Sequence, residues 1–162
     1  MYAAFRIEPV AQGALTIAEQ LHAMQMLAYA QEAQLLGAVH FPPLERTVEE
    51  VRSSTEEFLA AFIGEAMVGA VSVWPDQEGM GLNIASLVVA PQFQRQGIGR
   101  RLMVTVLAAH GGREFTVQTG AKNIPALALY AQAGFVELRR WFVGRESLEL
   151  VKLFRPASAV SS

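Results

Sequence analysis

The sequence has 162 residues, of which 52% are hydrophobic and 17% are charged, and its formal net charge is -2. This length and apolar share fit a single domain with a hydrophobic core. The lack of a basic excess argues against a nucleic-acid partner, and the absence of cysteine excludes disulfides, thiolate metal sites and a cysteine nucleophile.

Signals for targeting and for metal binding are also missing from the sequence. The N-terminal residues show no basic stretch followed by an apolar block, and no apolar run is long enough to span a bilayer. We therefore expect a cytoplasmic protein with no membrane partner. The histidines His22, His40 and His110 are widely separated, so no metal site is predicted. The oligomeric state stays open, with a homodimer among the options.

The first third of the chain predicts a strand followed by two helices. A strand is expected over residues 4–10, and a helix over Leu15–Leu36, where apolar residues recur at helical spacing up to a glycine. The next loop ends in a proline pair at Pro43, which argues against helix there. Thr47 and Glu50 form a capping-box pattern, so a short second helix should follow.

The middle of the chain changes to strand-forming sequence. Apolar runs at 58–63 and 67–74 are separated by Gly-Glu, which is typical of a hairpin. A third strand is expected over 82–90, with burial on both faces near its end. A helix should follow Pro91. Its apolar stripe consists of Ile98, Leu102, Val106 and Ala109.

The last part of the chain predicts a strand, a helix and a closing hairpin. The strand covers 114–118, and the helix covers 123–133 with an Asn cap and a Gly stop. Two further strands, 135–143 and 148–154, should pair around Gly144. Alternation of central strands with helices favours a mixed α/β sheet in one domain, residues 1–155. The small-residue segment 156–162 is expected to be a disordered tail.

The segment from Gln94 to Gly99 lies between the third central strand and its helix. Unpaired N–H groups at a helix start, beside the positive end of the helix dipole, bind anions. Gly97 and Gly99 would let a ligand approach the backbone closely. No Lys-Ser or Lys-Thr follows Gly99, so this is not a P-loop. Leu102 stands where a dinucleotide fingerprint needs its third glycine.

Gln94-x-x-Gly97-x-Gly99 resembles the acetyl-CoA signature, Q/R-x-x-G-x-G/A, of the GNAT superfamily of N-acetyltransferases. A preceding strand that ends in proline and a following leucine match the layout of that family. A second block matches as well, Asn123-x-x-Ala126-x-x-Leu129-Tyr130-x-x-x-Gly134-Phe135. The resemblance covers residues 4–154. It implies a twisted, mostly antiparallel sheet of about six or seven strands flanked by about four helices.

The resemblance also implies that acetyl-CoA is the co-substrate and indicates which residues hold it. Backbone amides of 94–99 would bind the pyrophosphate, while the strand edge at 87–89 and Asn123 would contact the pantetheine arm. Arg95, Arg100, Arg101 and Lys122 either neutralise phosphates or face solvent. The predicted cofactor contacts are Leu87, Val88, Val89, Gln94, Arg95, Gln96, Gly97, Ile98, Gly99, Arg100, Asn123 and Tyr130.

Asn123 and Tyr130 are seven residues apart, so they share one helix face. By the resemblance, Tyr130 is the catalytic acid that protonates the departing thiolate. A phenol of pKa ~10 can protonate a thiolate of pKa ~8.5 within hydrogen-bond reach. Two plainer interpretations stay open. Asn123 is also a good helix cap, and Tyr130 could be a core residue with its hydroxyl at the surface.

The residue that accepts the proton of the attacking amine, the general base, is harder to identify. Without cysteine, we expect direct attack of an amine on the thioester in a ternary complex. Some family members carry a carboxylate on the strand before the glycine turn, but residues 83–87 contain none. The candidates elsewhere are Tyr29, Glu32, His40, Asp76 and Glu78. Their plainer interpretations are that Glu32 lies on a solvated helix face and that Asp76 and Glu78 are ordinary turn residues.

These patterns predict an N-acetyltransferase that moves an acetyl group from acetyl-CoA to an amine on a small molecule or a peptide. The acceptor site is expected at the first two helices, the 37–43 loop and the hairpin near 139–145, with Phe41, Trp141 and Phe142 contributing apolar surface. The alternative is a non-catalytic acyl-CoA-binding or regulatory module of the same fold, which the missing strand carboxylate would permit.

Overall fold

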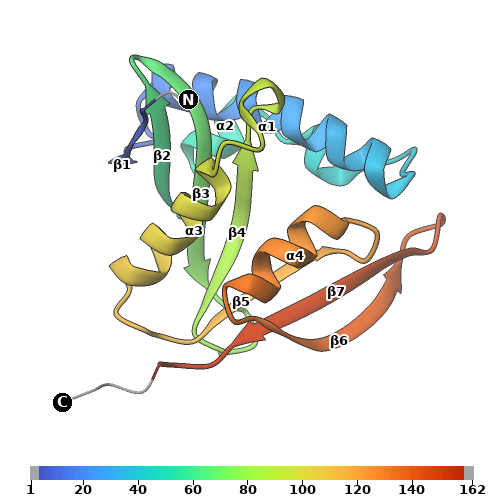
Figure 1. Cartoon of the computed structure of the whole chain (residues 1–162). Coiled ribbons are helices and arrows are strands. Elements are labelled where there is room, and N and C mark those ends of the chain that lie inside the picture. Colours follow the sequence, from blue (N-terminus) through green and yellow to red (C-terminus); the bar gives the residue numbers. More distant parts are fainter. Residues whose placement is uncertain (1–3, 159–162) are drawn as a thin grey trace.

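The computed structural model describes residues 4–158 and shows one mixed sheet flanked by helices (Figure 1). None of the helices in this range is long and apolar enough to cross a membrane. The elements are β1 (Arg6–Val10), α1 (Leu15–Leu36), η1 (Pro42–Glu45), α2 (Val48–Arg52), β2 (Glu57–Ile63), β3 (Ala66–Pro75), β4 (Leu82–Val89), η2 (Pro91–Phe93), α3 (Ile98–Ala109), β5 (Phe115–Gly120), α4 (Ile124–Gln132), β6 (Val136–Val143) and β7 (Leu148–Arg155).

The seven strands lie in the order β1-β2-β3-β4-β5-β7-β6. All neighbouring pairs are antiparallel except β4 and β5, which are parallel. A crossover connection through α3 joins these two strands, as a parallel pair requires. The expected mixed, mostly antiparallel sheet of about six or seven strands is therefore confirmed.

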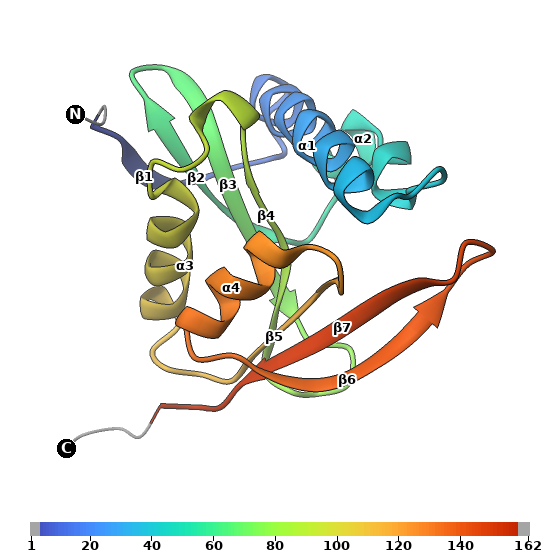
Figure 2. The same cartoon turned by 45° about the vertical axis from the view of Figure 1, so that its right-hand side comes forward.

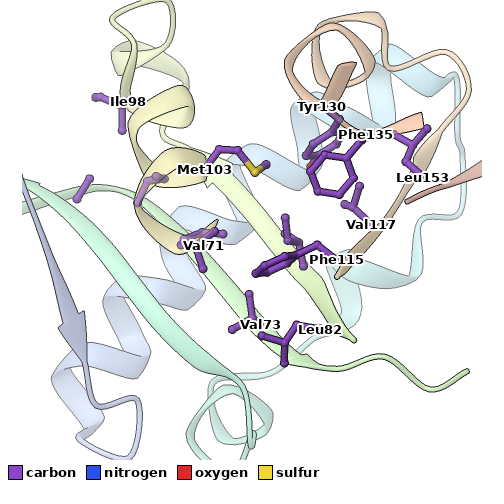
Figure 3. Close-up of a cluster of buried hydrophobic side chains, with 14 of the residues drawn as sticks. Val71, Val73, Leu82, Ile98, Met103, Phe115, Val117, Tyr130, Phe135 and Leu153 are labelled. Atoms are coloured by element: carbon purple, nitrogen blue, oxygen red, sulfur yellow. The ribbon is translucent and has the colours of Figure 1, made fainter. Parts of the chain in front are cut away.

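The helices cover both faces of the sheet. Figures 1 and 2 show α1 and α2 on one face and α3 and α4 on the other. Alternate side chains of β2 and β3 consequently enter two different cores. Ala60 and Ala70 pack with Leu21 of α1, whereas Ala61 and Val71 join the α3 side. Figure 3 shows the core on the α3 side of the sheet, which is the larger of the two.

The sheet is split between β4 and β5. The two strands pair only at their beginnings, through Leu82–Phe115, Asn83–Thr116 and Ile84–Val117. The β3–β4 register then shifts, because Ser72 lies opposite Ser86 while Val73 lies opposite Ile84, and Ala85 is the extra residue of a bulge. Residues 86–89 keep β3 as a partner, and residues 85–89 have no strand partner on the β5 side. We call this the open edge of β4.

Most of the predicted local signals are present in the structure. Thr47 and Glu50 form the capping box in full. The Asn123 side chain accepts a hydrogen bond from the Ala126 N–H at 3.3 Å, so it caps α4. Gly37 ends α1 in the left-handed region with φ 69°. Such signals are local, since they need only the chain's own neighbouring residues.

Three local expectations need correction. A 3-10 turn begins at Pro42, because prolines at the first helical positions lack an N–H that would be unpaired there anyway. In α3, Ala109 is exposed at the end of the stripe and Met103 is buried instead. At the end of β4 only one face is fully buried: Val88 is buried, whereas Leu87 and Val89 on the other face pack against the larger core but are partly buried.

The C-terminal segment is partly described. The Ser158 N–H donates to the Gly112 carbonyl at 2.8 Å, so the chain beyond β7 lies against the α3–β5 loop. Residues 159–162 lie outside the described range. The expected disorder of 156–162 therefore stays a prediction.

Candidate functional site

The glycine turn (residues 94–99) joins the end of β4 to α3. Its backbone is held by the Gln94 side chain, whose amide donates to the Val89 carbonyl at 3.2 Å and to Gln31 of α1 at 2.7 Å. Arg95 and Gly97 both adopt positive φ, 64° and 83°. Gly97 is the N-cap residue, and α3 begins at Ile98. These two left-handed residues turn the chain sharply from strand into helix.

The first turn of α3 presents backbone donors. The Arg101 N–H bonds to the Gly97 carbonyl at 3.0 Å, but the amides of Ile98, Gly99 and Arg100 have no acceptor within residues 4–158. A Cβ on Gly99 would lie 3.6 Å from Val89 Cγ2 and 3.8 Å from Leu129 Cδ2. Gly99 therefore faces the gap between β4 and α4. Free amides at a helix start are able to bind an anion.

Basic side chains flank this turn without forming a cluster. Arg95 and Arg100 are exposed. The Arg101 guanidinium lies over the Phe5 ring, 5.7 Å from its centroid. Lys122 is exposed and lines a small cavity on the other side of the split. Of these residues, only Arg95 and Arg100 are adjacent to the free amides, so the phosphate role expected of Arg101 and Lys122 finds less support.

Tyr130 lies in the larger core, with only 5% of its surface exposed. Its ring packs against Phe135 at a centroid distance of 5.7 Å. Figure 3 shows the two rings side by side near Val117. Burial raises the pKa of the Tyr130 phenol well above its ordinary range, and the charge of Glu32 adds to this effect. The phenol therefore stays protonated at any physiological pH.

Glu32 does not lie on a solvated helix face, so that expectation was wrong. Its side chain is half-buried, because the C-terminal half of α1 covers the end of β5. Burial raises the pKa of the Glu32 carboxyl, and the nearby Asn123 amide opposes the shift. One turn earlier, burial raises the pKa of the Tyr29 phenol to about 12, although the charge of Arg46 and a hydrogen bond with Ser86 oppose the shift. Side chains of α1 thus face both β4 and the start of α4.

A buried polar network under α1 was missed by sequence reasoning. Glu56 at the start of β2 is 3% exposed and accepts a hydrogen bond from the Ser72 hydroxyl at 2.5 Å. Ser72 is in turn 2.9 Å from the Ser86 hydroxyl on β4. Arg46 pairs with Glu56 from the other side. The only available signal was a serine at a buried position in each of two apolar strands, and it did not point to Glu56.

A cavity of about 790 Å³ opens beside the split. It lies between α1, the 37–43 loop, the end of β5 and the β6–β7 hairpin, whose tip extends toward the loop after α1 in Figures 1 and 2. Glu146 at that tip accepts hydrogen bonds from the N–H groups of Val39 at 2.7 Å and His40 at 3.3 Å. The lining residues are Glu32, Leu36, His40, Phe41, Pro42, Pro43, Gln118, Thr119, Gly120, Val143, Gly144, Arg145, Glu146, Leu148 and Leu150.

Only some of the residues expected to line the acceptor site line this cavity. Phe41 lines the cavity, but Trp141 does not, and Phe142 lines the smaller neighbouring cavity. Arg139 is directed elsewhere, since its guanidinium pairs with Glu78 at 2.5 Å and lies over the Trp141 ring. No residue of α2 lines the cavity. The loop after α1 and the hairpin tip therefore form its walls.

Asp76 and Glu78 belong to a separate ion cluster around a buried lysine. Asp76 accepts the turn hydrogen bonds expected of it, but it is also buried and lies 3.1 Å from Lys152 Nζ. Burial alone would raise the pKa of Asp76, yet hydrogen bonds from Thr116 and Lys152 lower it. Arg139 and Lys152 lower the pKa of Glu78 to about 2. Neither carboxylate lines the cavity.

Comparison with known protein families identifies the class of protein to which this fold belongs. The profile of the acetyltransferase (GNAT) family matches residues 18–135, which is most of the chain. The protein therefore belongs to the GNAT acetyltransferase family. Within the residues described here, no group of three or more His, Asp or Glu side chains is placed to hold a metal ion.

Two curated proteins are similar to this chain. N-alpha-acetyltransferase RimI of Mycobacterium tuberculosis is 33% identical over 138 residues, covering 82% of this chain and 84% of that protein. The UPF0157 protein YqkA of Bacillus subtilis is 35% identical over 121 residues, covering 74% of this chain. The match spans only 35% of YqkA, so this chain corresponds to about a third of that protein.

Solved structures show the same fold at low sequence identity. The ribosomal-protein-S18-alanine N-acetyltransferase of Escherichia coli superposes with a TM-score of 0.75 at 17% identity, covering 98% of this chain and 97% of that one. The acetyltransferase yncA of Salmonella typhimurium, solved with acetyl-CoA, gives a TM-score of 0.71 at 13% identity, covering 99% and 98%. At these identities, the likeness establishes the fold alone.

Proposed function

We propose that this protein is an N-acetyltransferase that transfers an acetyl group from acetyl-CoA to an amine by direct attack. One observation carries the proposal. The free amides at the start of α3 adjoin the open edge of β4 and α4, since Gly99 lies next to Val89 and Leu129, while the cavity is lined by α1, the end of β5 and the β6–β7 hairpin. A ligand threaded through the split would thus meet an acceptor in the cavity.

The donor half of the site suits a long ligand with a phosphate end. The pyrophosphate of acetyl-CoA is bound by the amides of Ile98, Gly99 and Arg100, which have no protein acceptor within 4–158. The pantetheine amides pair with the open edge of β4, as an added strand would. Asn123 remains half-exposed beside this path while it caps α4.

Tyr130 supplies the proton for the leaving group. Attack of the amine on the thioester carbonyl forms the C–N bond, and collapse expels the CoA thiolate. A phenol that burial keeps protonated can give its proton to this thiolate. The chain contains no cysteine, so no acyl-cysteine intermediate intervenes. The reducing cytoplasm suits such a chain, and we propose it as the compartment.

The acceptor enters from the cavity side. The similarity to a protein named as an N-alpha-acetyltransferase makes a peptide α-amine the first acceptor to test, and small primary amines the second. The competing proposal is a binding module without activity, because residues 83–87 carry no carboxylate. Both proposals require acetyl-CoA binding, so binding does not separate them.

Thiol release from acetyl-CoA across a panel of peptides and small amines tests the proposal. An acetyltransferase releases CoA thiol with at least one amine above the rate without amine. Gly99→Glu is the matched control, because its carboxylate would face the gap that the phosphates enter and should abolish both binding and release. Acetyl-CoA binding with no thiol release across the panel would instead favour the binding module.

A further inference from the structure

The open edge of β4 lacks a carboxylate, so the proton acceptor must come from another element. Three other carboxylates already have protein partners. Glu56 pairs with Arg46 and accepts from Ser72, and Asp76 pairs with Lys152. Glu146 accepts from two backbone amides at the cavity rim. None of these three is free to take a proton from a ligand.

Glu32 differs from them in position and in partners. It lines the cavity, and no Lys, Arg or His within residues 4–158 forms an ion pair with it. Its carboxylate interacts with the Asn123 amide, and its charge acts on the phenols of Tyr29 and Tyr130. Glu32 therefore lies where the cavity meets the two residues of the second family block.

We propose that Glu32 binds the acceptor as an ammonium ion and takes its proton, and that the cavity holds an apolar group carried by that amine. This inference rests on the acetyltransferase function proposed above. A half-buried carboxylate without a cation beside it is a site for a cationic ligand, since the ligand supplies the missing charge.

The proton balance of the reaction is complete with two groups. The ammonium gives one proton to the Glu32 carboxylate and becomes the neutral amine. The amine nitrogen attacks the thioester carbon, and its second proton is lost as the C–S bond breaks and the amide forms. Tyr130 protonates the thiolate and is restored by that second proton. The net products are an amide, CoA thiol and one proton, which Glu32 releases to solvent through the cavity.

The cavity wall indicates which amines fit. Apart from Glu32, its inner surface is formed mainly by the apolar side chains of Leu36, Phe41, Pro42, Pro43, Val143, Leu148 and Leu150. A primary amine on an alkyl or aromatic group would bury that group against this wall, at roughly 0.8 kcal/mol per CH₂. Strongly polar substituents would lose hydration against this apolar part of the wall.

The charged groups around Glu32 set the pH dependence of the reaction. Tyr29 on α1 and Tyr130 on α4 are neutral phenols, while His40, Arg145 and Glu146 lie around the cavity. The base works only when ionised, so kcat/KM should fall as the pH drops through the pKa of Glu32. Because burial raises this pKa, the acidic limb should lie above the usual range of a glutamate.

Glu32→Gln tests the assignment, with Glu19→Gln as the matched control on the exposed face of α1. We expect Glu32→Gln to lower kcat/KM by about 10²–10⁴-fold and to remove its acidic limb, while the acetyl-CoA Kd stays unchanged. Glu19→Gln should leave both unchanged. Removal of a carboxylate that burial disfavours should not lower Tm, so loss of folding does not confuse the result.

Amine binding gives a second readout that does not depend on turnover. In calorimetry with the CoA-loaded protein, alkylamines of increasing length should bind the wild type progressively more tightly, and Glu32→Gln should weaken all of them at least tenfold. Retained rate, pH profile and amine affinity in Glu32→Gln would overturn this inference while leaving the proposed function intact. A wild type that binds acetyl-CoA but neither binds nor acetylates any amine would overturn both.

Discussion

Tyr130 has a packing role in the core and a proposed role as the catalytic acid. Its ring contacts Phe135 in the core. The negative charge of Glu32 adds to burial in raising the pKa of its phenol. The two roles can be separated by one substitution, because Tyr130→Phe keeps the ring and removes only the hydroxyl. We expect kcat to fall by about 10²-fold or more, with the acetyl-CoA Kd and Tm little changed. Single-turnover thiol release and calorimetry measure this, and an unchanged rate would exclude Tyr130 as the acid.

Gly97 and Gly99 should respond differently to the same substitution. Gly97 has φ 83°, so Gly97→Ala should cost about 1–2 kcal/mol of folding free energy through backbone strain alone, since nothing lies within 4 Å of an added Cβ. Gly99 is helical, so Gly99→Ala should preserve or raise Tm. Its methyl group would still face the gap between β4 and α4, and acetyl-CoA affinity should fall.

Thermal melts and acetyl-CoA titration of the two glycine variants check this contrast. A Tm loss in Gly99→Ala together with full affinity would contradict the placement of the phosphates at this turn. The contrast is informative because the two residues are only two positions apart.

At the residue scale, sequence reasoning succeeded where a signal is local. Asn123 could be predicted as a cap because its partner, Ala126, is three residues away. Glu32 and Glu56 could not be placed, since their surroundings come from β5, β3 and β4, which are distant in the sequence. Burial of a charged side chain depends on such distant neighbours, and no periodicity records it.

At the element scale, Lys152 ties the β3–β4 turn to β7 across the sheet. Its ammonium lies 3.1 Å from Asp76 and 2.7 Å from Glu78, and the residue is 1% exposed. Lys152→Met should lower the free energy of unfolding by about 3–5 kcal/mol, because Asp76 would be left buried without a cation. Chemical denaturation measures this. Arg140→Met, which breaks an exposed pair on β6, is the control and should change Tm little.

The same cluster predicts a pH dependence of stability. Folding lowers the pKa of Asp76 and lowers that of Glu78 to about 2. The unfolded chain therefore takes up protons at a higher pH than the folded chain does. The free energy of unfolding should be constant above the ordinary carboxyl range and fall as the pH drops below about 4. In Lys152→Met this fall should be shallower, and an identical slope in both proteins would contradict the role of Lys152.

Element order could be predicted almost completely, but element pairing could not. Hairpins such as β2–β3 and β6–β7 follow from two strand patterns around a short turn. The parallel β4–β5 pair, its early end at Ile84 and the bulge at Ala85 depend on how α3 crosses over the sheet. The split is therefore a tertiary feature that no local sequence pattern records.

At the scale of the whole molecule, acetyl-CoA bound across the split should stabilise the folded state. A ligand bound at about a hundred times its Kd stabilises the folded state by ~2.7 kcal/mol. For a chain of this size, that corresponds to a rise in Tm of roughly 5–10 °C. Differential scanning calorimetry measures the shift. The control is S-acetylpantetheine, the acetylated arm without the pyrophosphate and nucleotide. No shift at saturation would contradict both the transferase and the binding-module proposals.

The early end of the β4–β5 pair divides the sheet into halves joined by three residue pairs. The sequence contains two tryptophans, and one falls on each half. Trp74 of β3 donates its indole N–H to Asn83 at 3.1 Å, while the Trp141 ring of β6 lies 5.2 Å from the Arg139 guanidinium. Each half therefore carries its own intrinsic fluorophore in a distinct setting. Single-tryptophan variants would report optically on either half as ligands enter, without any attached dye.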